Sequence, residues 1–158
     1  MEDERLVPFA AAFARTHDRL WRALLAYSGD PEVASDAAAE AYAQAVRRAD
    51  AIVDVDAWVW RAAFRIAAGE LTRRRRAGDH PAPERPADAV DAPAPAWELI
   101  DALGQVTERQ RQVLVLRYVG GYSAVEIARR FGTSAGSVRV SLLRARRTLR
   151  KLLEDDDA

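Results

Sequence analysis

Apolar residues recur along most of this 158-residue chain at the three- and four-residue spacing that places them on one face of a helix. The pattern is clearest near the C-terminus, where, at about 100° per residue, five side chains share one stripe: Val138, Leu142, Ala145, Leu149 and Leu152. No segment alternates apolar and polar residues for long enough to indicate a strand. The pattern therefore predicts an all-α protein, in which this stripe faces the core.

Three helices are predicted in the first part of the chain. The apolar residues of the first are Leu6, Phe9, Ala10, Phe13, Leu20, Trp21 and Leu24. The second is expected to begin at Asp30 and Pro31, because aspartate is a favoured N-cap and proline at the first helical position gives up no hydrogen bond. The third is expected to start at Asp54 or Asp56 and to run into the four arginines at 73–76.

A proline-rich segment, residues 77–95, separates the two halves of the chain. It holds five of the seven prolines and almost no bulky apolar side chain. Because proline fixes φ and lacks an N–H, we expect an extended tether here, with no helix or central strand running through it. The tether would join a three-helix module, residues 1–76, to a second helical module, residues 96–153, which an acidic tail follows at 154–158.

The second module has the sequence signals of a helix-turn-helix. Thr107–Gln110 and Ser123–Glu126 both fit the capping box, in which a hydroxyl and a side chain three residues later bond to each other's backbone N–H groups. The pair Gly120–Gly121 and the single Gly132 are expected to end the helices before them, and Ser134 to cap the last helix. A short helix, a three-residue turn containing glycine and a longer helix are typical of this DNA-binding motif.

Basic residues gather in the second module, although the formal net charge of the chain is zero. Residues 107–151 carry eleven basic and two acidic side chains, whereas the whole chain has 24 of each. Such a local excess is typical of a module that binds a polyanion. We therefore favour a nucleic acid as its partner over the alternative of a merely solvated helix face.

The last helix is expected to turn the face opposite its apolar stripe towards DNA. The candidate contacts read from the helical wheel are Ser134, Gly136, Ser137, Arg139, Val140, Leu143, Arg144 and Arg147. Arg139 and Arg144 suit bidentate reading of guanine, while Val140 and Leu143 are placed to touch thymine methyl groups or to pack on a protein partner. The three residues at the helix start suit a phosphate. For Arg147, solubility is an equal alternative.

Nothing in the sequence predicts catalysis, a cofactor or a metal site. The chain has no cysteine, its two histidines lack convincing partners, and it has no phosphate-binding glycine loop with its lysine. No apolar run approaches the roughly 18 residues of a membrane helix, and the acidic N-terminus lacks the features of a signal peptide. We expect a cytoplasmic protein that is not an enzyme.

With these features, the chain resembles the extracytoplasmic-function group of bacterial RNA polymerase sigma factors. The blocks "ERQRQVLVLRY", "EIARRFGTS", "GSVR" and "RARRTL" are similar to the C-terminal domain of that family. This resemblance implies that Arg139, Val140, Ser141, Leu143 and Arg144 face the −35 promoter element. It also implies the fold of the family, with a sigma-2-like N-terminal module and a sigma-4-like C-terminal module.

In the N-terminal module, "DPEVASDAAAEAYAQAV" and "AWVWRAAFRIAAGELTRRRR" occupy the places of the family's core-binding and promoter-melting helices. The resemblance implies that Asp36, Glu40 and Tyr42 contact core RNA polymerase. The implied −10 contacts are Trp58, Arg61, Arg65, Arg73 and Arg74. For Trp58 and its neighbour Trp60, packing in the core is the favoured alternative. The chain departs from the family at Ala37–Ala39, where larger side chains and a glutamine are usual, and at Arg65 and Gly69.

The family resemblance implies a transcription initiation factor that binds core RNA polymerase, recognises a −35 element and melts the −10 element of promoter DNA. It also implies a regulatory partner, such as an anti-sigma factor. Two alternatives remain open. One is a stand-alone helix-turn-helix regulator, in which the first module dimerises or senses a signal. The other is a degenerate sigma-like interaction protein, suggested by the alanine run and by Arg65.

Overall fold

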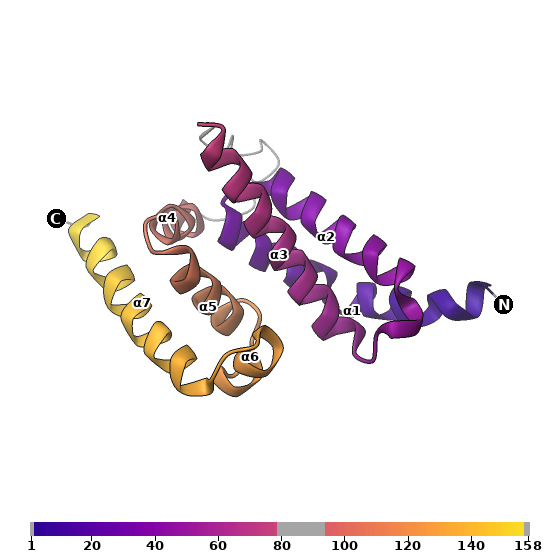
Figure 1. The fold of residues 1–158 in the computed structure, drawn as a ribbon. Coiled ribbons are helices and arrows are strands. Elements are labelled where there is room, and N and C mark those ends of the chain that lie inside the picture. The colour runs from indigo at the N-terminus through magenta and orange to yellow at the C-terminus, as the bar shows by residue number, and fades with distance from the viewer. Residues whose placement is uncertain (1, 79–93, 157–158) are drawn as a thin grey trace. The chain divides into compact units, whose positions relative to one another are not determined.

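The computed structural model describes residues 2–78 and 94–156, and every long regular element in these ranges is a helix (Figure 1). The helices are α1 (Glu2–Ser28), α2 (Pro31–Arg47), α3 (Val55–Arg76), α4 (Ala94–Leu103), α5 (Glu108–Tyr118), α6 (Ala124–Phe131) and α7 (Ala135–Asp156), with a short 3-10 helix at Ala49–Ala51. The prediction of an all-α protein is confirmed.

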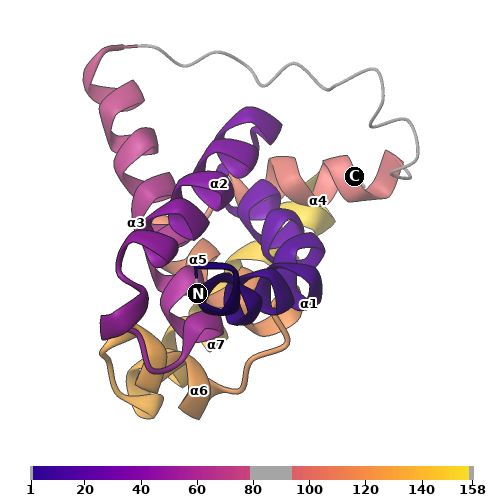
Figure 2. The same cartoon turned by 90° about the vertical axis from the view of Figure 1, so that its right-hand side faces the viewer.

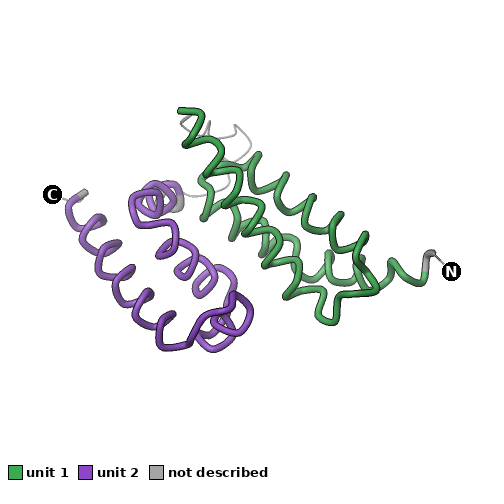
Figure 3. Tube along the Cα trace, viewed as in Figure 1, with its two compact units in different colours: residues 1–82 green, residues 83–158 purple. Residues whose placement is uncertain are grey.

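The chain divides into two compact units, which are described separately here: unit 1, residues 1–82, and unit 2, residues 83–158 (Figure 3). Most of the predicted linker, residues 79–93, lies outside the described residues. Its last two residues, Ala94 and Pro95, belong to the first turn of α4, a position where proline is tolerated because the first N–H groups of a helix have no partner within it.

Unit 1 is a three-helix bundle in which each of α1, α2 and α3 packs against the other two (Figure 1 and Figure 2). Its largest fully buried side chains are Leu20, Leu24, Val59, Trp60 and Phe64. Helix α2 contributes mainly alanines to this core, namely Ala34, Ala37, Ala38, Ala41 and Ala45, each no more than 1% exposed. Because interhelical distance depends on the side chains at the contact, these short side chains let α2 approach its neighbours closely.

The apolar face predicted for α1 is only partly buried. Phe9, Leu20 and Leu24 lie in the core, but Leu6 and Phe13 are each 44% exposed. Leu6 belongs to the start of α1, which projects beyond the ends of α2 and α3 (Figure 1), so the neighbouring helices do not cover this turn. The other buried residues of α1 are Ala12, Ala23 and Tyr27.

The starts of α2 and α3 are set by aspartate caps, as the sequence predicts. The Asp30 carboxylate accepts from the Glu32 N–H at 2.8 Å, and Pro31 is the first residue of α2. At the start of α3 the cap is Asp54, which accepts from the Ala57 N–H at 3.1 Å. Asp56, the other candidate, instead forms an ion pair with Arg15 at 3.3 Å.

Unit 2 contains the helix-turn-helix formed by α6, residues 132–134 and α7, with α5 packed against both helices. Both predicted capping boxes are present, at Thr107 and at Ser123. Gly132 ends α6 in the left-handed conformation, at φ 68°, which glycine adopts without steric cost. Ser134 then caps α7, because its hydroxyl accepts from the Ser137 N–H at 3.1 Å.

The turn after α5 depends on Gly120, and its replacement by alanine should destabilise unit 2. A Cβ there would lie 2.7 Å from the Leu116 carbonyl oxygen, which already accepts from the Tyr122 N–H at 3.1 Å. We expect Gly120→Ala to lower the free energy of unfolding by about 1–3 kcal/mol, measured by urea denaturation. Gly136→Ala is the control, since its Cβ meets nothing within 4 Å and alanine favours a helix. Equal stability of the two variants would contradict this account of the turn.

Candidate nucleic-acid interface

The orientation of α7 is fixed by its apolar stripe. Val138, Leu142 and Ala145 are each no more than 3% exposed, because they pack against α5 and α6. Farther along the stripe, Leu149 and Leu152 are only half-buried. The predicted core side of α7 is therefore confirmed over its first three turns, and the opposite side of these turns is exposed.

That opposite side presents most of the residues predicted to meet DNA. Ser134, Gly136, Arg139, Val140, Leu143, Arg144 and Arg147 are exposed, and Ser137 and Ser141 are half-buried. Among the residues that the structure describes, Arg139, Arg144 and Arg147 take part in no ion pair. Their guanidinium groups are therefore available to phosphates or base edges, whose recognition commonly uses arginine.

A cleft beside α7 adds a residue that the sequence did not single out. The cleft has a volume of about 550 Å³, and its lining includes Arg109, Gln110, Ser137, Val140 and Arg144. The Arg109 Nη2 donates to the Ser137 Oγ at 2.8 Å, which ties the first turn of α5 to the first turn of α7. Arg109 thus brings a further positive charge to the predicted DNA side. Its position in the first turn of α5, two residues after the Thr107 cap, was the available signal.

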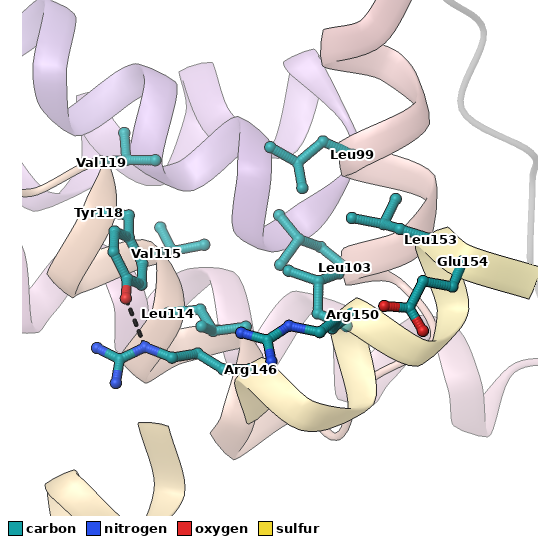
Figure 4. Close-up of a pocket in the computed structure, with 11 residues that line it drawn as sticks. Leu99, Leu103, Leu114, Val115, Tyr118, Val119, Arg146, Arg150, Leu153 and Glu154 are labelled. Atoms are coloured by element: carbon teal, nitrogen blue, oxygen red, sulfur yellow. Dashed lines mark hydrogen bonds between the residues drawn. The ribbon is translucent and has the colours of Figure 1, made fainter. Parts of the chain in front are cut away.

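A different arginine of α7 is turned away from this side. The Arg146 Nε donates to the Tyr118 hydroxyl of α5, and the guanidinium lies over the tyrosine ring, 5.4 Å from its centroid. Figure 4 shows this pair at the edge of an apolar groove of about 530 Å³ lined by α4, α5 and α7. Leu149 lines this groove, which explains why it is less buried than the rest of its stripe.

In unit 1, the three residues predicted to contact polymerase have different environments. Asp36 and Glu40 are exposed on α2, and hydrogen bonds from Gln44 and Arg47 lower the pKa of Glu40. Tyr42 is only 8% exposed, and its hydroxyl is 2.7 Å from the Thr16 hydroxyl. Burial raises the pKa of Tyr42. Tyr42 therefore belongs mainly to the core of unit 1.

The alanine run of α2, Ala37–Ala39, lies mostly on the buried side of the helix. Ala37 and Ala38 are 1% and 0% exposed, and only Ala39 faces outward. These two alanines thus alter the packing of α2 on α1 and α3 rather than the shape of its outer surface. Where the family has larger side chains at these two positions, this chain therefore has a smaller side-chain volume in the core of unit 1.

The residues predicted to contact −10 DNA lie along α3. Arg61, Arg65 and Arg73 are exposed and Trp58 is half-buried, whereas the neighbouring Trp60 is fully buried and packs in the core. Trp58, Arg61 and Arg65 share one side of α3 by their spacing of three and four residues.

Two of the four arginines in the last turn of α3, Arg73 and Arg74, pair with carboxylates. Arg73 pairs with Glu70 at 2.6 Å. Arg74, with 20% of its side chain exposed, donates to Asp30 at 2.6 Å and to Glu70 at 3.1 Å. Through its bond to Asp30, Arg74 joins the last turn of α3 to the start of α2, so it takes part in the tertiary structure of unit 1.

Comparison with known proteins identifies the family. Residues 96–149, which run from α4 through most of α7, match the family described as Sigma-70, region 4. The whole chain is also similar to the RNA polymerase sigma-E factor of Streptomyces antibioticus, with 30% identity over 99% of this chain and 91% of the relative. The chain is an RNA polymerase sigma factor of the extracytoplasmic-function group.

Two further comparisons set the extent of the similarity. The sigma factor is 27% identical to the ECF RNA polymerase sigma factor BldN of Streptomyces coelicolor over 93% of its own length, but it spans only 62% of BldN. Its fold matches the sigma factor RpoE of Bartonella quintana, solved in complex with the anti-sigma factor NepR, with a TM-score of 0.73, 20% identity and coverage of 93% and 97% of the two chains.

The sigma factor is a component of transcription initiation, and proteins of this family are in general not enzymes. In the described ranges, no three or more histidine, aspartate or glutamate side chains form a group that could hold a metal ion. Within the same ranges, no helix is both long and apolar enough to span a membrane.

Proposed function

We propose that this sigma factor binds bacterial core RNA polymerase and directs it to promoters whose −35 element is read by α7 and whose −10 element is opened by unit 1. The observation that carries the proposal is the outer side of α7. Three arginines without an ion pair in the described structure flank two exposed apolar side chains there, on a helix whose inner side is fixed in the core. A recognition helix needs this combination: one side packed firmly in the core, and exposed side chains on the other side that can contact bases.

Within this proposal, the −35 contacts are the nine residues predicted from the sequence, from Ser134 to Arg147, with Arg109 as a neighbouring phosphate contact. Trp58, Arg61 and Arg65 meet the −10 strand, and Arg73 joins them if DNA displaces its pairing with Glu70. A positively charged surface with an aromatic side chain suits single-stranded DNA. Asp36 and Glu40 provide the exposed contacts to polymerase on α2. Tyr42 lies mainly in the core of unit 1 and holds α2 against α1 through its contact with Thr16.

We also propose an anti-sigma partner, because the structurally similar RpoE of Bartonella quintana was solved with one, and action in the cytoplasm, where the polymerase works. The stand-alone regulator is less well supported, since similarity to sigma factors extends over both units. The degenerate alternative is also less well supported at the alanine run, because Ala37 and Ala38 face the core of unit 1 and only Ala39 is exposed.

In-vitro transcription tests the proposal. Purified core polymerase is combined with promoter fragments of the source genome, with and without this protein, and transcript 5′ ends are mapped. We expect new, discrete start sites that share an upstream and a downstream element. Stable polymerase binding without any transcript would favour the degenerate alternative. Absence of both binding and transcripts, together with a dimer in solution, would favour the stand-alone regulator.

A further inference from the structure

We propose that Val140 and Leu143 read the methyl groups of two neighbouring thymines in the upstream promoter element, an inference that rests on the function proposed above. These side chains are 47% and 48% exposed, while Val138 and Leu142, on the other side of the same turns, are 1% and 3% exposed. An exposed apolar side chain gains free energy only when a ligand removes it from water. Two of them on the face turned outward are suited to an apolar group on the ligand.

The charges around this pair favour DNA over a protein as that ligand. Arg139, Arg144 and Arg147 flank the two side chains, are exposed, and take part in no ion pair within the described part of the chain. A protein that covered Val140 and Leu143 would have to place acidic groups or other acceptors beside these arginines, or leave them in water at the edge of the interface. In a DNA groove, phosphates and guanine acceptors meet the arginines while base edges meet the apolar side chains.

The chemistry of the major groove then selects the base. Among the four bases, only thymine presents an apolar group there, its C5-methyl, and the other edges present donors or acceptors. Placing valine or leucine against such polar edges would remove them from water without a hydrogen bond, which costs free energy. Apolar contact at these two positions is therefore expected to select thymine over the other three bases.

The spacing of the pair predicts how the thymines are arranged. Residues 140 and 143 are three apart on α7, which separates them by about 4.5 Å along the helix axis. One step between base pairs is about 3.4 Å. When the axis of α7 runs along the major groove, two side chains so spaced reach adjacent base pairs rather than the same one. In this arrangement the methyl groups should lie one base step apart, on the same or opposite strands.

The test uses the complex of the full chain with core polymerase on a promoter whose start site has been mapped. Deoxyuridine, which lacks only the methyl group, replaces each thymine of the upstream element in turn, at complex concentrations below saturation. We expect transcription to fall about fourfold at two neighbouring positions, the size expected for burying one methyl group. Val140→Ala should remove the penalty at one position, and Leu143→Ala at the other.

A matched control is Val125→Ala, which shortens another exposed valine, 45% exposed on α6, and should leave both penalties in place. Full transcription from templates with deoxyuridine throughout the upstream element would overturn the inference while leaving the proposed function intact. Loss of output in Val140→Ala that is equal on thymine and uracil templates would also overturn it, because that result indicates a protein contact. Absence of any promoter-specific transcript would overturn the proposed function, and this inference with it.

Discussion

Replacing Arg139 and Arg144 together by alanine is expected to lower promoter-specific transcription by about 30-fold or more, because each well-placed bidentate contact to a base is worth about 1–3 kcal/mol. Both side chains are exposed and take part in no ion pair among the described residues, so the loss should not come from unfolding. The free energy of unfolding should stay within about 0.5 kcal/mol of the unsubstituted protein. The measurement is run-off transcription from a mapped promoter.

A second double variant separates geometry from charge. Arg139→Lys with Arg144→Lys keeps both positive charges but removes the planar fork that recognises guanine with two hydrogen bonds. We expect it to lose nearly as much promoter-specific transcription as the alanine variant, while retaining more of the salt-dependent, non-specific binding to DNA. Polymerase binding should be unchanged in both. Unaltered promoter output from the alanine variant would show that α7 does not read the −35 element through these residues.

The parts of this fold that could be predicted from the sequence are those that depend on near neighbours in the chain. The caps at Asp30, Thr107 and Ser123 each act on an N–H two or three residues away, so residue type and spacing are sufficient to find them. The outer side of α7 was predicted for a related reason. Once Val138 and Leu142 define the core side of a regular helix, the opposite side follows from its geometry.

The parts that could not be predicted depend on contacts between distant segments. Leu6 and Phe13 share the apolar spacing of α1 but are 44% exposed, because the lengths and positions of α2 and α3 decide which turns are covered. Arg109 meets Ser137 across 28 residues of sequence, and Arg74 meets Asp30 across 44. A run of four arginines gives no local sign of which one points inward, so Arg74 was predicted to contact DNA together with Arg73.

Arg74→Ala is expected to lower the free energy of unfolding of unit 1 by about 2 kcal/mol, between the values typical of exposed and buried ion pairs. Arg74 is only 20% exposed at its side chain and serves two carboxylates, Asp30 and Glu70. Removing it leaves the 18% exposed Asp30 side chain without its cation. For a domain of this size, the change corresponds to about 8–16 °C in Tm, which calorimetry would detect.

Three matched variants make this prediction specific. Arg73→Ala removes an arginine whose side chain is 69% exposed and should cost about 0.5 kcal/mol or less. Asp30→Asn keeps an N-cap, since asparagine caps as well as aspartate, but removes the charge, so it should weaken the effect of Arg74→Ala in a double-mutant cycle. The prediction would be contradicted if Arg74→Ala lost no more stability than Arg73→Ala and also lost promoter opening. That result would indicate that Arg74 contacts DNA, as the sequence predicted, and does not stabilise unit 1.

The same cluster should show a characteristic dependence on pH. Hydrogen bonds from Arg73, and then from Arg74, lower the pKa of Glu70 from 4.5 to about 2. Because its folded pKa is depressed, Glu70 stabilises unit 1 fully above pH 4.5, and this contribution is lost as the pH falls towards 2. Arg74→Ala removes only the part of this contribution that Arg74 provides, because Arg73 still pairs with Glu70. The difference in stability between the unsubstituted protein and Arg74→Ala should therefore be constant near neutral pH and shrink in part below pH 4.5. A difference that did not change between pH 7 and pH 2 would mean that Arg74 stabilises unit 1 by packing and not by its charge.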